Sequence, residues 1–190
     1  PEIGQLLNLQ MLHLGSNQLS TLPPEIGRLS NLRTLHLSVN PLNELPPEIG
    51  QLSNLQTLDL DDTRLTTLPS EIGRLSNLQT LRLWSKQLSM LPPEIGQLSN
   101  LRLLRLWSKQ LSILPPEIGQ LSSLQTLDLG KDQLTMPPPE IVEQGTPAVL
   151  AYLRGLQKPG IELYEAKIIL LRALQGLPFD PLLSPTHGID

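Results

Sequence analysis

The stretch LQTLRLWSKQLSMLPPEIGQLSN, Leu78 to Asn100, decides the fold of this chain because it is one complete copy of a repeated 23-residue unit. Each copy reads L-x-x-L-x-L, then a variable segment, then L-x-x-L-P-P-E-I-G-x-L, with few departures. Six copies open 23 residues apart, at Leu9, Leu32, Leu55, Leu78, Leu101 and Leu124. Self-similarity at a fixed period of this length is typical of a solenoid.

The physics of the fold follows from one copy. Leu12 and Leu14 alternate with outward residues, which is the period of a half-buried strand. One strand per copy predicts a parallel sheet on the concave face, with strands about 4.8 Å apart. Leu-Pro-Pro cannot continue a sheet, because proline lacks an N–H, so it turns the chain to the convex side, where Glu-Ile-Gly-x-Leu allows one helical turn. The apolar set of the first copy is Leu9, Leu12, Leu14, Leu19, Leu22, Ile26 and Leu29.

These motifs resemble the leucine-rich repeat, in the length class common inside cells, and the likeness covers Pro1 to about Pro138. The resemblance implies an α/β solenoid, a right-handed horseshoe whose concave sheet is parallel. No copy can bury its leucines alone, so we expect stability to come from the stacking of neighbours.

The pattern changes after Met136 to PPPEIVEQGTPAVLAYLRGL, which predicts a cap on the last copy. Thr146 suits the N-cap of a helix and Pro147 its first position. The apolar residues at helical spacing should cover the leucines of the sixth copy, and Gly160 should end the segment: Val149, Leu150, Leu153 and Leu156. We therefore divide the chain into repeats (1–138), a capping helix with its linker (139–160) and a final fragment (161–190).

The cap and the following LYEAKIIL resemble the junction between repeats and GTPase domain in bacterial Roco proteins. That family joins leucine-rich repeats to a Ras-like domain called Roc and a dimerising domain called COR. The resemblance implies a strand at Lys167 to Leu170, a helix at Leu171 to Gly176, and a first switch segment at Pro185 to Asp190. In that segment Thr186 would lie near a metal ion.

The family carries a phosphate-binding loop, G-x-x-x-x-G-K-[ST], between the strand and the helix, where backbone N–H groups and a lysine hold phosphates. No such motif occurs in the 190 residues, so no nucleotide site is intact and Thr186 is only a relic. Two explanations stay open. Either the gene has lost the loop, or the loop exists in the protein and its residues are omitted from the sequence between Leu170 and Leu171. GTP and Mg²⁺ are expected only if the parent protein has the loop.

Outward positions of the strands form rows across the copies. One row, at the fourth residue after the leucine that opens each copy, is His13, His36, Asp59, Arg82, Arg105 and Asp128. The next row, two residues further on, is Gly15, Ser38, Asp61, Trp84, Trp107 and Gly130. Tryptophan and arginine are enriched at binding hot spots, so copies four and five predict a partner site. We take as its residues Arg82, Trp84, Arg105, Trp107, Asp59 and Asp61. The alternative is that two duplicated copies merely pack their rings together.

The position that usually holds asparagine also varies, through Asn17, Asn40, Thr63, Lys86, Lys109 and Asp132. Asparagine can both donate to and accept from the loop backbone, whereas lysine only donates and is costly to bury. We therefore expect copies four and five to be looser there, with the lysine amines of Lys86 and Lys109 either reaching carbonyl groups or escaping to solvent. His13, His36 and Asp59 could hold zinc, and Asp59, Asp61 and Asp62 calcium. Solvated surface side chains explain both groups more simply, and we expect no metal.

Composition narrows the function. The net charge is −4 and cysteine is absent, which speaks against nucleic-acid binding, disulfides and thiolate metal sites. Stacking of single-stranded bases on the tryptophans is disfavoured by the neighbouring aspartates. No apolar run approaches the length of a membrane helix. We expect a cytoplasmic, monomeric, non-enzymatic scaffold that binds a protein, or its own parent chain, on the concave face. The alternative is part of a Roco GTPase.

Overall fold

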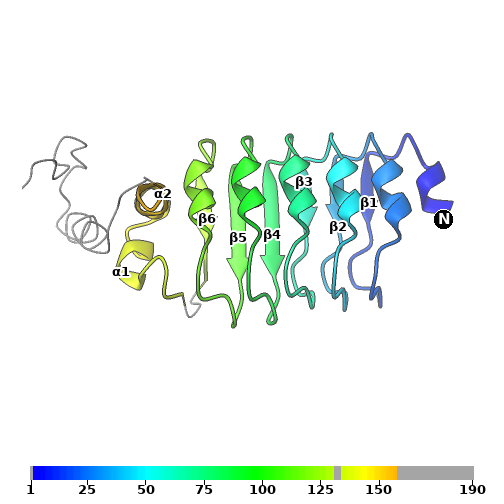
Figure 1. Ribbon diagram of the computed structural model, residues 1–190. Coiled ribbons are helices and arrows are strands. Elements are labelled where there is room, and N and C mark those ends of the chain that lie inside the picture. Colours follow the sequence, from blue (N-terminus) through cyan, green and yellow to red (C-terminus); the bar gives the residue numbers. More distant parts are fainter. Residues whose placement is uncertain (1, 131–133, 158–190) are drawn as a thin grey trace, which may run out of the picture.

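Six strands lie side by side in one parallel sheet in the computed structural model of the protein, which describes residues 2–130 and 134–157 (Figure 1). Their spatial order is their chain order, and every pair is in register. The strands are β1 (Met11–His13), β2 (Thr34–His36), β3 (Thr57–Asp59), β4 (Thr80–Trp84), β5 (Leu103–Trp107) and β6 (Thr126–Asp128). The predicted solenoid with one strand per copy is confirmed.

Short 3₁₀ helices form the opposite side of the solenoid (Figure 1). Five of them have five residues and follow a proline in the extended conformation, which ends the preceding segment as predicted. They are η1 (Glu2–Gln5), η2 (Pro24–Arg28), η3 (Pro47–Gln51), η4 (Ser70–Arg74), η5 (Pro93–Gln97) and η6 (Pro116–Gln120).

The core is a column of leucine and isoleucine between the strands and the 3₁₀ helices. In the middle copies every predicted apolar position is buried, and Leu58, Leu81 and Leu104 have no exposed surface at all. In the first copy Leu9, Leu12, Leu14 and Leu19 are only partly buried, because β1 is the edge strand of the described sheet. Burial thus depends on a neighbour on each side, as expected of stacked repeats.

Neighbouring 3₁₀ helices touch through their glycines. A Cβ atom added to Gly73 of η4 would lie 2.6 Å from the carbonyl oxygen of Glu94 in η5. Gly27 and Gly50 make the same approach to Glu48 and Glu71. The glycine of Glu-Ile-Gly therefore permits backbone-to-backbone stacking, which no larger residue allows.

Asparagine side chains join successive copies in two places, a repeated ladder and the single residue Asn40. In the Leu-Ser-Asn-Leu segments, each Nδ2 donates to a carbonyl of the preceding copy at 2.8 Å, from Asn31, Asn54, Asn77 and Asn100. The repeat pattern alone does not predict this ladder. In the variable segment, buried Asn40 donates to the carbonyls of Leu14 and Leu37 and accepts from the N–H of Leu19. The predicted two-sided role of asparagine is thus confirmed at Asn40.

The expectation of a looser loop in copies four and five is wrong, whereas the expectation that their lysines can escape to solvent is confirmed. Here β4 and β5 have five residues, two more than the other strands. Ser85 and Ser108 are buried one position earlier, and their hydroxyls donate to the carbonyls of Leu65 and Leu88 in the preceding copies. The serine thus takes over the buried role, and the lysine that follows it is exposed.

A helical cap covers the last copy, built from α1 (Pro139–Val142) and α2 (Thr146–Gly155) (Figure 1). The predicted apolar face packs on the core: Val149 and Leu153 are almost fully buried, Leu150 is buried, and Leu156 is partly buried. The N-cap assignment is wrong, since Gly145 precedes the helix and Thr146 is its first residue.

The hydroxyl of Thr146 bonds to the last described strand instead of capping the helix. Its Oγ1 accepts a hydrogen bond of 2.9 Å from the N–H of Leu127 in β6. A backbone group of the last described strand is satisfied in this way. Gly160, the fragment 161–190 with Thr186, and Asp132 lie outside the described residues. No helix in the described ranges has both the length and the apolar character needed to cross a membrane.

Candidate functional site

The predicted rows of outward side chains match the residue pairing between neighbouring strands of the sheet. His13 pairs with His36, His36 with Asp59, and Asp59 with Arg82. Arg82 then pairs with Arg105 and Trp84 with Trp107, on β4 and β5. Five of the six predicted site residues therefore lie in the strands along the open face, and Asp61 lies just beyond the end of β3. Asp59 is buried, however, so its predicted direct contact with a partner is not supported.

The two tryptophans form an exposed aromatic pair. Their ring centroids are 6.3 Å apart with an interplanar angle of 66°, the edge-to-face arrangement that aromatic rings prefer. Each residue keeps 37% of its surface exposed. The indole Nε1 of Trp107 donates to Asp128 Oδ1 at 3.0 Å, and the guanidinium of Arg105 lies 5.2 Å from the centroid of that ring. The pair is thus both exposed and held in place.

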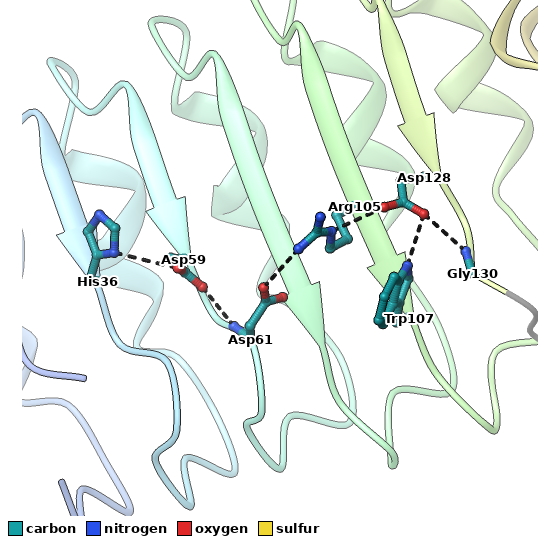
Figure 2. A network of polar contacts seen from close by, with 7 residues as sticks. All are labelled: His36, Asp59, Asp61, Arg105, Trp107, Asp128 and Gly130. Atoms are coloured by element: carbon teal, nitrogen blue, oxygen red, sulfur yellow. Dashed lines mark hydrogen bonds and ion pairs between the residues drawn. The ribbon is translucent and has the colours of Figure 1, made fainter. Parts of the chain in front are cut away.

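Arg105 is already engaged on both sides (Figure 2). Its Nε donates to Asp128 Oδ2 at 3.2 Å, and its Nη1 reaches across β4 to Asp61 Oδ2 at 3.6 Å. Arg82 makes no hydrogen bond or ion pair with any residue in the described ranges. Sequence reasoning treated the two arginines as equivalent and left Asp128 out of the site, although its place one repeat after Arg105 in the same row was a usable signal.

The aspartates differ in protonation behaviour. Burial and the neighbouring Asp59 raise the pKa of Asp61 above its usual value, against the opposing pull of Arg105 and Arg82. Its Oδ1 is buried without a hydrogen-bond partner among the described residues. For Asp128 burial alone would raise the pKa, but hydrogen bonds from Trp107, Gly130 and Arg105 together hold it below the usual value.

The histidines and Asp59 form the far end of the network. The rings of His13 and His36 are stacked with centroids 4.5 Å apart, and His36 Nδ1 lies 3.5 Å from Asp59 Oδ2. Asp59 Oδ1 accepts from the N–H of Asp61 at 3.0 Å, which orients the carboxylate (Figure 2). In the part of the chain that the structure describes, no three His, Cys, Asp or Glu side chains are grouped so as to hold a metal ion.

The arrangement offers contacts to a partner. Its three carboxylates and two guanidinium groups leave one net negative charge, so the face is mixed rather than basic. Both indoles are partly exposed, and the guanidinium of Arg82 and the Nε1 of Trp84 form no hydrogen bond with the described residues. Apolar surface with nearby donors suits recognition of a peptide or protein surface.

Comparison with known proteins matches residues 1–66 and 48–105 to the family model described as a leucine-rich repeat region. A solved structure of the Leptospira interrogans protein LIC12759 is 45% identical, with a TM-score of 0.59, and the match covers 70% of this chain and 40% of that chain. A search of curated proteins gave no match.

Two plant receptor structures are also similar. The ectodomain of GASSHO1/SCHENGEN3 from Arabidopsis thaliana, in complex with CASPARIAN STRIP INTEGRITY FACTOR 2, is 40% identical with a TM-score of 0.59, over 70% of this chain and 17% of that chain. The plant peptide hormone receptor RGFR1, in complex with RGF2, is 36% identical with a TM-score of 0.50, over 65% and 25% of the two chains. This chain thus spans well under half of each of these relatives.

Proposed function

This chain belongs to the leucine-rich repeat family, and from that premise we propose that it is a protein-interaction scaffold that binds a protein segment on the open face of its sheet. The observation that carries the proposal is the exposed, edge-to-face pair of Trp84 and Trp107. The plant receptor structures similar to this chain, one in complex with CASPARIAN STRIP INTEGRITY FACTOR 2 and one with RGF2, support it.

The site is organised before a partner arrives. Asp128 holds the indole of Trp107 and the guanidinium of Arg105, so these side chains lose little freedom on binding. Immobilising a flexible side chain at an interface costs about 0.5–1.5 kcal/mol, which an ordered site avoids. Arg82 supplies an uncommitted guanidinium beside the rings and can engage a carboxylate through two parallel hydrogen bonds.

Replacing either tryptophan with alanine should weaken binding of the natural partner roughly thirtyfold, the equivalent of about 2 kcal/mol, because a buried aromatic anchor is lost. Folding should be preserved, since both rings point out from the sheet. Partners are captured with the wild-type array, and their affinities for Trp84→Ala, Trp107→Ala and the control Gln110→Ala are then measured by calorimetry. Gln110→Ala should lose less than about threefold.

Equal affinities for all three variants would move the partner site away from the tryptophans. The next surface to test would then be the acidic end of the row, at the partly exposed Asp61 beside the buried Asp59. Trp84→Ala is easier to interpret, because Trp107→Ala also removes the indole N–H that donates to Asp128.

For the parent protein we propose a Roco architecture, with repeats at 1–138, a cap with its linker at 139–160 and the start of a Roc domain at 161–190, in a cytoplasmic protein. The support is the sequence of the cap and of LYEAKIIL. The partner could then be another domain of the same parent chain. In this second candidate function the parent binds and hydrolyses GTP through a phosphate-binding loop that the 190 residues lack. We propose that these 190 residues by themselves form a monomer.

The chain as given should bind neither GTP nor GDP, because no phosphate-binding loop or its lysine is present. Calorimetric titration with each nucleotide and Mg²⁺ checks this. A dissociation constant below about 100 μM, close to −5.5 kcal/mol, would contradict the expectation. The parent protein with an uninterrupted sequence around Leu170 is the matched comparison, and GTP binding there would support the Roco proposal.

A further inference from the structure

The edge of the array at which the strands end carries large apolar side chains in copies four and five (lower edge in Figure 1). Trp84 and Trp107 are the last residues of β4 and β5. Six residues later, past a turn, Met90 and Ile113 are 61% and 53% exposed. Exposed apolar residues therefore lie before and after the same turn in two successive copies.

Lysines occupy the tip of this turn. In copy four the N–H of Leu88 donates to the carbonyl of Ser85, which closes a turn with Lys86 at its centre. Lys109 holds the same place in copy five, and both lysines are exposed. Neither forms a hydrogen bond or ion pair within the described ranges. In these copies the buried side chain is the serine just before the lysine, whose hydroxyl donates to a carbonyl of the preceding copy, and the lysine that follows it is exposed.

Copies one to three have a different edge. Their residues before the turn are Gly15, Ser38 and Asp61, and those after it are Thr21, Glu44 and Thr67. None is a large apolar residue or a lysine. In a chain of net charge −4, copies four and five thus combine four apolar side chains with two uncompensated positive charges. The apolar row extends to Met136 of copy six, which pairs with Ile113.

We propose that this edge surface, made of Trp84, Lys86, Met90, Trp107, Lys109 and Ile113, binds an acidic protein segment whose carboxylates lie between two apolar anchors. One anchor meets the tryptophans, the carboxylates meet the lysines, and the second anchor meets Met90 and Ile113. The inference rests on the proposed protein-binding function and names the chemistry of its partner.

Charge on the neighbouring face supports this partner. Arg105 is paired with Asp61 and Asp128, so the two exposed lysines supply the positive charge that a partner meets at this edge. Asp128, which accepts the hydrogen bond of Trp107, and Asp61 on the neighbouring face would repel a continuous anionic membrane. A protein segment can instead cross the edge and place its own carboxylates only at the turn. Electrostatic complementarity of this kind sets partner choice and association rate.

The test uses the fluorescence of Trp84 and Trp107, which are the only tryptophans in the chain. The probe is the peptide Leu-Leu-Glu-Glu-Glu-Leu-Leu, with its N-terminus acetylated and its C-terminus amidated. Its counterparts carry lysine for glutamate, or serine for leucine. The acidic apolar peptide should change the emission, and raising the salt concentration should weaken its binding. Both counterparts should bind at least about tenfold more weakly.

Matched variants assign the effect to the edge. Lys86→Glu/Lys109→Glu should lose about tenfold in affinity for the acidic peptide, as should Met90→Ser/Ile113→Ser. Arg28→Glu/Arg74→Glu makes the same change in net charge on exposed positions of η2 and η4 and should bind like wild type. Circular dichroism checks that each variant is folded.

The proposed edge surface would be wrong if wild type and Lys86→Glu/Lys109→Glu bound the acidic peptide equally well. It would also be wrong if wild type bound the lysine peptide as tightly as the acidic peptide. The protein-binding function would stand in that case if a peptide or captured partner still loses affinity with Trp84→Ala. If neither peptides nor partners respond to Trp84→Ala, the proposed function itself fails. Binding to vesicles of phosphatidylserine and phosphatidylcholine that is lost in Lys86→Glu/Lys109→Glu would assign the edge to a membrane and overturn the proposal.

Discussion

Replacing Gly73 with alanine should destabilise the array by about 3 kcal/mol, the upper part of the range for overpacking. The new Cβ would lie 2.6 Å from the carbonyl oxygen of Glu94 and 2.9 Å from its Cβ. These atoms belong to η5, whose helix end is fixed by its own stacking on the next copy. The clash can therefore be relieved only by moving two copies apart, which opens the leucine column. Urea unfolding followed by circular dichroism measures the loss.

Gly4→Ala is the control for this substitution. Its Cβ would have nothing nearer than 3.1 Å, and one of the two nearest atoms is the Cδ of the Arg28 side chain, which can move. We expect a change of less than about 1 kcal/mol, since the lower backbone entropy of the unfolded alanine chain offsets part of the contact. Equal losses for Gly4→Ala and Gly73→Ala would mean that close stacking of the 3₁₀ helices is not what requires glycine.

Asn40→Ala should cost a similar free energy of unfolding, about 3 kcal/mol, because it leaves buried backbone groups without partners. The side chain is 2% exposed. Its Nδ2 donates to the carbonyls of Leu14 at 2.8 Å and Leu37 at 2.9 Å, and its Oδ1 accepts from the N–H of Leu19 at 3.0 Å. Two of these bonds reach the first copy, so the loss should separate copies one and two before the rest unfolds.

Asn17→Ala removes asparagine from the same position of the first copy and is the matched control. Asn17 is exposed and donates only to Leu14 and Gly15 of its own copy, where water can replace it. We expect a loss of less than about 1 kcal/mol. Hydrogen exchange at the N–H of Leu19 should rise in Asn40→Ala and stay unchanged in Asn17→Ala. An Asn40→Ala variant as stable as wild type would contradict the role assigned to this side chain.

Much of the candidate site was predictable, because a repeat fixes which residues share a row. The alignment of Arg82 with Arg105 and of Trp84 with Trp107 needed only the 23-residue spacing and the alternation of a strand. The roles inside the row were not predictable. Arg105 bridges Asp61 and Asp128 while Arg82 makes no such contact, although both follow the same local sequence. Their difference lies in the neighbours that each copy meets.

The residue type at a single position gave a wrong structural expectation at two places. Lysine at the asparagine position predicted a loose loop, yet Ser85 and Ser108 are buried instead and β4 and β5 lengthen. Thr146 has the residue type of an N-cap, but its hydroxyl accepts from Leu127 of the last described strand. In both cases a backbone group of an adjacent copy competes for the side chain.

By itself, the sequence determined the solenoid, the parallel order of its strands, the buried leucine column and the set of side chains on the open face. These follow from short-range periodicity, which every copy repeats. Only the tertiary structure decided which arginine is engaged, which serine replaces asparagine, how closely the glycines stack and where the lysines emerge. Those features depend on contacts between copies, where distances of a few ångströms select one hydrogen-bond partner over another, and the pattern within a single copy carries no such distances.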